Sequence, residues 1–192
     1  MTDRSILEPV TVAAAANPEV EAAPADSGVR RVYGRRSQEM FGFARRLGLS
    51  DEDASDAVQE TMLRLWRELE DGKEILDLEA WAFRALYRLS IDHHRFRRRL
   101  LGLLDRLGSR AGAGDHRTDG GDPAQLPDTD SIWREVDRLP ERQRAVLYLR
   151  YRADLPYERI GRALSITPGA ARGHASTGLA TLRRRLGEEA ER

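Results

Sequence analysis

Arginines recur around residue 90 at the spacing of one helical face. At about 100° per residue, four of them lie within about 60° of one another: Arg84, Arg88, Arg95 and Arg99. Arg97 and Arg98 extend this arginine stripe, and the interleaved aromatic residues are Trp81, Phe83, Tyr87 and Phe96. Because guanidinium groups follow a phosphate backbone and ring faces accept unstacked bases, the pattern is typical of single-stranded nucleic acid binding. A solvated arginine face with the rings in the core, partly paired through Asp92, is an equally good interpretation.

An acidic segment precedes this stripe and offers the opposite chemistry. Apolar residues between 53 and 70 recur at three- and four-residue steps, which predicts an amphipathic helix. The side chains expected to project from its polar face are Asp56, Gln59, Glu60, Leu63 and Arg64. Such a face suits a protein partner with basic patches, and a plain solvated face would have the same pattern.

Two short helices with a tight turn are predicted near the C-terminus. Pro156 opens the first, which continues to Leu164, and Thr167 caps the second with Pro168 in its first turn. Only residues 165–167 separate them, so we expect a helix-turn-helix whose second helix enters the major groove. Its outward residues are small, which permits close backbone approach and leaves specificity mainly to DNA shape and phosphate contacts.

Signals for catalysis are weak. There is no cysteine, which excludes disulfides and thiolate chemistry. The histidines, at positions 93, 94, 116 and 174, do not have zinc-ligand spacing, and we interpret His93 and His94 as interface or phosphate-facing residues. No phosphate-binding loop or nucleophile elbow is present. We therefore expect no enzyme activity, no catalytic residue, no metal and no cofactor.

The composition is that of a protein with one medium or two small domains. The 192 residues are 40% hydrophobic and 33% charged, with 32 basic and 32 acidic side chains. The charge is segregated: residues 50–79 carry eleven acidic and three basic side chains, and residues 80–110 carry two and eight. No apolar run approaches the ~20 residues of a membrane span, and no secretory signal is visible in the N-terminal residues. We expect a cytoplasmic protein that does not bind membranes.

Helical periodicity without strand-like alternation predicts an all-α fold of two small domains. The expected helices include residues 31–47, ended by Gly48, residues 53–70, capped by Ser50, residues 78–99, and residues 140–152. We predict a disordered tail at 1–28, a helical-bundle domain at 29–107, a flexible acidic linker at 108–130, a helix-turn-helix domain at 131–187 and a tail at 188–192.

The order of these motifs resembles one family. Residues 53–66 (DASDAVQETMLRLW) look like the polymerase-binding helix of the extracytoplasmic-function (ECF, group four) sigma factors of the sigma-70 family. Residues 80–95 (AWAFRALYRLSIDHHR) look like their promoter-melting helix. Residues 139–150 (LPERQRAVLYLR) and the helix-turn-helix resemble their second domain. The resemblance covers residues 33 to 186 with a variable linker.

The resemblance implies a transcription initiation factor that binds core RNA polymerase through the beta-prime clamp helices and the beta flap. Asp56, Gln59, Glu60 and Leu63 would dock on the clamp helices. The loop at 72–77 and the following helix would bind and open the minus-ten element, with these residues in contact: Lys73, Trp81, Arg84, Tyr87, Arg88, His93, Arg95, Arg97 and Arg98. The residues facing the minus-thirty-five element would be Thr167, Gly169, Ala170, Arg172, Gly173, His174, Ser176, Thr177 and Arg184. An anti-sigma factor would be a further partner.

Several residues depart from the family pattern. Arg88 stands where asparagine is common, at a position associated with the extruded base, and Arg159, Gly161 and Ser165 alter the usual helix-turn-helix sequence. The sequence is also compatible with two alternative functions: a dimeric helix-turn-helix regulator that acts without polymerase, and an adaptor or anti-sigma-like protein that binds polymerase without opening DNA. An enzyme of unknown type is a more remote alternative. Light scattering would identify a dimer, and permanganate reactivity of promoter thymines would identify strand opening.

Overall fold

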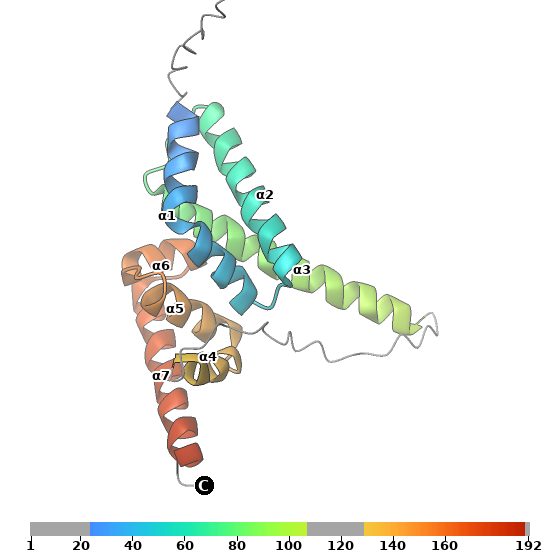
Figure 1. Ribbon diagram of the computed structural model, residues 1–192, viewed down its shortest axis with the longest axis vertical. Helices are drawn as coiled ribbons and strands as arrows, with labels where there is room; N and C mark the ends of the chain where they lie inside the picture. Colours follow the sequence, from blue (N-terminus) through green and yellow to red (C-terminus); the bar gives the residue numbers. More distant parts are fainter. Residues whose placement is uncertain (1–23, 107–128, 191–192) are drawn as a thin grey trace, which may run out of the picture.

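The computed structural model describes residues 24–106 and 129–190, which form seven helices and no strand (Figure 1). The predicted all-α fold is therefore confirmed for these ranges. Most of the predicted tail and nearly all of the predicted linker, residues 1–23 and 107–128, lie outside the described residues.

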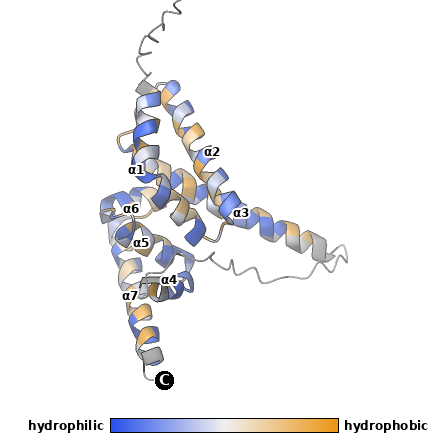
Figure 2. Cartoon of the chain, viewed as in Figure 1, coloured by the Kyte–Doolittle hydropathy of each residue, from blue (hydrophilic) through white to orange (hydrophobic). Residues whose placement is uncertain are grey.

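Three helices form the first domain, and each packs on the other two: α1 (Pro24–Arg46), α2 (Asp51–Glu70) and α3 (Leu78–Arg106). Their shared core contains Met40, Phe43, Leu65, Phe83 and Leu86, all fully buried. The second half of α3 projects away from this bundle (Figure 1). Hydrophobic and hydrophilic residues alternate along each helix, as expected where one side of an amphipathic helix is buried (Figure 2).

The second domain contains α4 (Thr129–Asp137), α5 (Glu141–Tyr151), α6 (Tyr157–Leu164) and α7 (Pro168–Ala190). Helix α7 contacts each of the other three, and Leu147, Leu149, Leu155 and Ile160 are fully buried among them. This domain also packs against the first, because α6 lies on α3 and α5 lies on α1 (Figure 1). Sequence patterns predicted the helices of both domains except α4, and they did not predict the docking.

The predicted helix ends are confirmed at three positions. The Ser50 hydroxyl accepts the backbone N–H of Asp53 at 3.1 Å, and the Thr167 hydroxyl accepts that of Ala170 at 3.1 Å. Gly48, with φ of 95°, follows the end of α1 in the left-handed region that glycine adopts without strain.

The turn between α6 and α7 contains two of the family departures. Ser165 closes α6 with φ 54° and ψ 47°, the left-handed conformation for which glycine is the usual residue. A Cβ at Gly161 would lie 2.7 Å from the carbonyl oxygen of Ile166, so the turn folds back where only glycine fits. Gly161 therefore suits this turn, whereas Ser165 holds a left-handed conformation that glycine would adopt with less strain.

Some predicted boundaries were wrong. Helix α1 begins at Pro24 rather than near residue 31, so the last residues of the predicted tail are helical; the buried Ala25 and Val32 show why, since the bundle core extends to this turn. Helix α4 begins at Thr129, inside the predicted linker, and α7 continues to Ala190, inside the predicted C-terminal tail. Packing against neighbouring helices extends a helix beyond what local propensity alone supports.

Candidate nucleic-acid and protein interfaces

Helix α2 presents the predicted polymerase-binding residues on its solvent side. Asp56 and Gln59 are exposed, Leu63 is 51% exposed, and Glu60 is half-buried and accepts a 2.7 Å hydrogen bond from Arg64. Their opposite face fills the core with these residues: Ala54, Val58, Thr61, Met62 and Leu65. The predicted set therefore shares one accessible face.

Trp66 belongs to the same face and was absent from the predicted set. It is 39% exposed and follows Leu63 by three residues, so the two apolar side chains lie on adjacent turns. The three-residue spacing between Leu63 and Trp66 in the sequence was enough to place Trp66 on this face. A partly exposed tryptophan beside an exposed leucine has the composition of a protein-binding hot spot.

The acidic N-terminus of α2 is held by a local network. Asp51, Glu52 and Asp53 occupy the first turn, where carboxylates complement the helix dipole. The hydrogen bond from Ser50 lowers the pKa of Asp53 below its ordinary value, and the neighbouring His93 acts in the same direction. His93 Nε2 lies 3.5 Å from Asp53 Oδ2, so this predicted minus-ten residue faces a carboxylate of its own domain.

His94 also has a contact within its own domain. Its Nε2 contacts the carbonyl oxygen of Leu47 at the end of α1, and its ring lies over Gly48. The ring nitrogen of His94 thus contacts one of the free carbonyls that a helix end leaves, and its role as an interface or phosphate-facing residue stays a prediction.

The arginine stripe lies along α3, and its members differ in their exposure to solvent. Arg84 is half-buried, Arg88 and Arg95 are exposed, and Arg97 is half-buried. Arg98 lies in the helix, and nothing is described of its side chain. Asp92 pairs with Arg95 at 3.7 Å. The expected pairing of Asp92 was with Arg88, and the structure instead leaves Arg88 projecting outward without that contact.

The rings of α3 divide between core and surface. Phe83 is fully buried and meets Phe43 edge-on at 5.7 Å between ring centroids. Tyr87 is only 8% exposed, and its hydroxyl donates a 2.8 Å hydrogen bond to Glu141 in α5. Burial and this hydrogen bond raise the pKa of Tyr87 to about 12. Tyr87 therefore cannot accept a base in this arrangement, whereas Trp81 is half-buried and Phe96 is 67% exposed.

The loop between α2 and α3 leads into this helix. Leu76 is fully exposed, and Lys73 is exposed and paired with Glu68 at 2.8 Å. The hydrogen bond with Glu68 raises the pKa of Lys73 above its ordinary value. Asp77 ends the loop and caps α3, accepting the backbone N–H of Ala80 at 3.0 Å.

The outward face of α7 is open. All but one of its predicted DNA-facing residues are exposed: Thr167, Gly169, Ala170, Arg172, Gly173, Ser176, Thr177 and Arg184. His174 is half-buried. Arg172 is paired with Glu158 at 3.2 Å and stacks over the ring of Tyr157 at 5.6 Å, so its guanidinium is held at the edge of this face.

Residues 24–106 and 129–190 contain no group of three His, Asp or Glu side chains placed to hold a metal ion. None of the helices in these ranges combines the length and apolar character that a bilayer crossing requires.

Comparisons with known proteins agree with the two-domain division. Residues 32–100 match the sigma-70 region 2 family, and residues 136–184 match the sigma-70 region 4 family. The RNA polymerase sigma factor CnrH of Cupriavidus metallidurans is 34% identical over 90 residues, which is 43% of this chain and 47% of that protein. The match thus spans about half the length of this curated relative.

Two solved structures share the fold. The sigma factor RpoE of Bartonella quintana, in complex with the anti-sigma factor NepR, has a TM-score of 0.62 and 21% identity, covering 82% of this chain and 98% of that chain. CnrH in complex with the cytosolic domain of CnrY has a TM-score of 0.57 and 23% identity, covering 87% of this chain and 95% of that chain.

The two family matches fall on the two helical domains in the expected order, with the predicted linker between them. Members of this family are transcription initiation factors that are not enzymes. The chain belongs to the sigma-70 family.

Proposed function

We propose that this chain is an ECF sigma factor that binds core RNA polymerase, recognises minus-thirty-five and minus-ten promoter elements and promotes strand opening. The observation that carries the proposal is the adjacency, in one domain, of two faces with opposite chemistry. Helix α2 offers Leu63 and Trp66 among carboxylates, and α3 offers a stripe of arginines. A second domain ends in a helix-turn-helix with an open recognition face.

Each face has a role in this proposal. The α2 face docks on the beta-prime clamp helices, and the second domain adds a contact with the beta flap. Helix α3 and the loop before it hold the non-template strand of the minus-ten element, where unpairing costs a few kcal/mol that the contacts must offset. Helix α7 lies in the major groove at the minus-thirty-five element. The chain itself catalyses no reaction, and its work takes place in the cytoplasm.

An anti-sigma factor is part of the proposal. In the two solved structures described above, RpoE is bound to the anti-sigma factor NepR, and CnrH is bound to the cytosolic domain of CnrY. The exposed α2 face and the open α7 face give such a partner two surfaces to cover.

Reconstituted transcription tests the proposed function. Purified chain and core polymerase should together start transcripts at discrete sites in a genomic DNA library, whereas core polymerase alone should not. The chain alone should bind promoter DNA feebly, because each domain is small.

Two outcomes would redirect the assignment. A stable dimer by light scattering, with a palindromic site and no need for polymerase, would favour the helix-turn-helix regulator. Tight binding to core polymerase without permanganate-reactive promoter thymines would favour an adaptor.

A further inference from the structure

The recognition helix α7 carries one long side chain on an otherwise smooth face. Among residues 168–177, Arg172 has the only exposed side chain that is longer than threonine. At about 100° per residue, it lies within about 60° of Gly169 and Ser176 around the helix axis. The N-terminal residues of a recognition helix are those that contact base edges in the major groove. Arg172 is therefore placed where a single side chain can decide a sequence preference.

Two residues in the first turn of α6 hold Arg172. Its Nη2 lies 3.2 Å from Oε1 of Glu158, and its Cζ lies 5.6 Å from the centroid of the Tyr157 ring. A guanidinium within about 6 Å of a ring centroid is attracted to the ring face. Tyr157 is half-buried and packs against the hydrophobic core, so its ring is anchored. The two contacts restrict the orientation of the guanidinium before DNA arrives.

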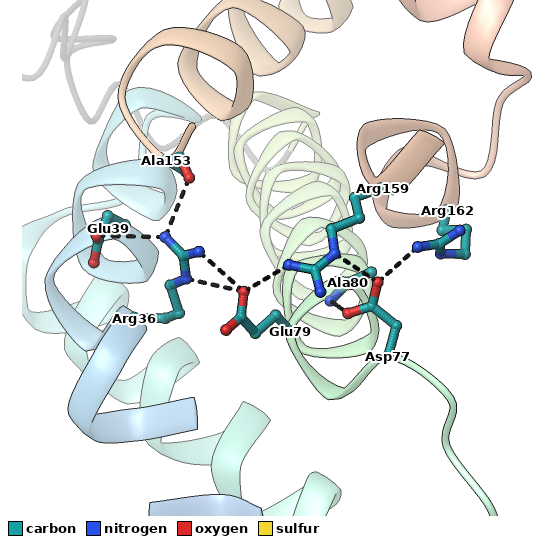
Figure 3. Close-up of polar contacts among 8 residues, drawn as sticks. All are labelled: Arg36, Glu39, Asp77, Glu79, Ala80, Ala153, Arg159 and Arg162. Carbon is teal, nitrogen blue, oxygen red and sulfur yellow. Dashed lines mark hydrogen bonds and ion pairs between the residues drawn. The ribbon is translucent and has the colours of Figure 1, made fainter. Parts of the chain in front are cut away.

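The setting of Arg172 is local to the helix-turn-helix. Glu158 is only 14 positions away in the chain, and Tyr157 is its neighbour. By contrast, Arg159 of the same helix pairs with Asp77 and Glu79 of the first domain (Figure 3). The orientation of Arg172 therefore depends on contacts within one domain.

The Glu158 carboxylate favours a base edge over a phosphate as the partner of Arg172. A phosphate oxygen that approached this guanidinium would meet a second anion beside it, and like charges at such distances repel. A base edge is neutral and is not repelled. The guanidinium has five N–H donors, and the hydrogen bond to Glu158 involves Nη2. Enough donors remain for the two parallel hydrogen bonds that guanine accepts at O6 and N7.

The pair between Arg172 and Glu158 contributes little to folding. Both side chains are 57% exposed, and water screens the attraction between charges that are this accessible. Its effect is on recognition, because an arginine side chain whose orientation is already restricted loses less freedom when it binds. The contacts around Arg172 therefore suit preorganisation for a ligand.

We propose that Tyr157 and Glu158 are positioning residues, which hold Arg172 so that it reads one guanine of a G·C base pair in the minus-thirty-five element. The identity of that element rests on the proposed function, whereas the reading of duplex DNA by Arg172 does not. Phosphate contacts elsewhere supply affinity without regard to sequence. Loss of the guanidinium fork, or of its positioning, should therefore remove the guanine preference and leave duplex binding in place.

Selection from a library of randomised DNA duplexes tests the proposal. The full-length chain is used without polymerase and at low salt, where weak duplex binding is strengthened. It should select sequences with one position at which guanine dominates. Fluorescence anisotropy then compares a selected duplex with the same duplex carrying A·T at that position, and the parent chain should prefer the first about ten-fold.

Substitutions divide the roles of the three residues. Arg172→Lys keeps the charge and removes the fork, so the two duplexes should bind about equally well. Tyr157→Leu should lower the preference about three-fold, in line with an exposed cation–π contact, and Glu158→Ala should also lower it. Tyr157→Phe keeps the ring and should retain the preference. The measured quantity is a ratio of two affinities, which a general loss of folded protein does not change.

Tyr151→Leu is the matched control, because it makes the same replacement at a 55% exposed ring of the same domain that lies outside α6 and α7. It should leave the ratio unchanged. Circular dichroism checks that each variant keeps its helices. If Tyr157→Leu does not fold, Glu158→Ala keeps the test decisive, because it replaces an exposed side chain.

The outcomes distinguish this proposal from the proposed function. A parent chain that selects no guanine, or an Arg172→Lys chain that keeps the preference, would overturn the readout by Arg172. Equal ratios in the parent, Tyr157→Leu and Glu158→Ala would overturn the positioning role. A chain that shows the preference but starts no transcripts with core polymerase supports the readout and contradicts the proposed function. A chain that starts transcripts without a guanine preference does the reverse.

Discussion

Helices α3 and α7 are both assigned to DNA, yet they offer it different surfaces. On α7 the small outward residues, such as Gly169 and Gly173, are exposed. On α3 the rings of Phe83 and Tyr87 are buried, and the accessible side chains are the arginines of the stripe, the exposed Phe96 and the half-buried Trp81. A helix that reads a duplex needs a smooth exposed face, whereas one that grips an unpaired strand needs rings that its own core competes for.

Reversing the charge of two arginines in the stripe should have the largest effect. It should impair strand opening by α3 and leave the binding of core polymerase by α2 unchanged. Arg84→Glu with Arg88→Glu should lower open-complex formation about 100-fold, equivalent to about 2.7 kcal/mol, because both side chains then repel the strand. Permanganate reactivity of promoter thymines measures this. The control, Arg31→Glu with Arg35→Glu, reverses two exposed arginines of α1. Equal losses of strand opening and of core polymerase binding would contradict the division between α3 and α2.

A substitution on the polymerase-binding face of α2 should weaken the binding of core polymerase. It should therefore reduce promoter recognition by both α3 and α7. Trp66→Ala should weaken binding to core polymerase about 30-fold, in line with the ~2 kcal/mol of an aromatic hot spot. Fluorescence anisotropy of labelled chain measures the affinity. Tyr33→Ala, which removes an exposed ring of α1 outside this face, should have little effect. If the two variants bind equally well, the apolar pair does not form the centre of the interface.

A side chain on the smooth face of α7 should act on duplex binding alone. Gly173→Glu places a long anionic group where a Cβ meets nothing within 4 Å, so the domain should fold normally. Binding to a minus-thirty-five duplex should fall about ten-fold, and core binding should not change. Gly187→Glu, equally open but at the far end of α7, serves as the control. Equal effects at both glycines would argue against groove insertion around residue 173.

The smallest effect concerns the buried ring of α3. Because the pKa of Tyr87 is raised to about 12 from 10.0, folding favours its neutral phenol. The stabilisation is complete below pH 10 and is lost as pH rises through about 12. Tyr87→Phe should remove one tyrosine that titrates near 12 in the alkaline absorbance of the folded chain. Loss of a group titrating near 10 instead would place the ring in solvent.

Local signals predicted the helices well where one residue decides the outcome. The hydroxyls of Ser50 and Thr167 each satisfy a free backbone N–H, and Gly48 tolerates positive φ, so these ends are set within a few residues of chain. The polar face of α2 followed from its period alone. Helix α4 and the first turns of α1 were missed because burial against other helices, and not local propensity, stabilises them.

The candidate interfaces were predicted unevenly for a related reason. The face of α7 consists of residues too small to build a core, so sequence implied its exposure. An aromatic ring on α3 serves core or ligand equally well, and only packing against Phe43 and α5 assigned Phe83 and Tyr87 to the interior. The roles of His93 and His94 likewise depended on which carboxylate and carbonyl the fold brought near them.

The amino-acid sequence by itself determined the helical periods, the caps, the segregation of charge and the order of motifs that identifies the family, since each depends on residues a few positions apart. Only the tertiary structure decided which rings are buried and that Asp77 and Glu79 meet arginines of both domains. Those contacts join residues up to 85 positions apart, and no local pattern specifies a contact whose existence depends on how two separate domains pack.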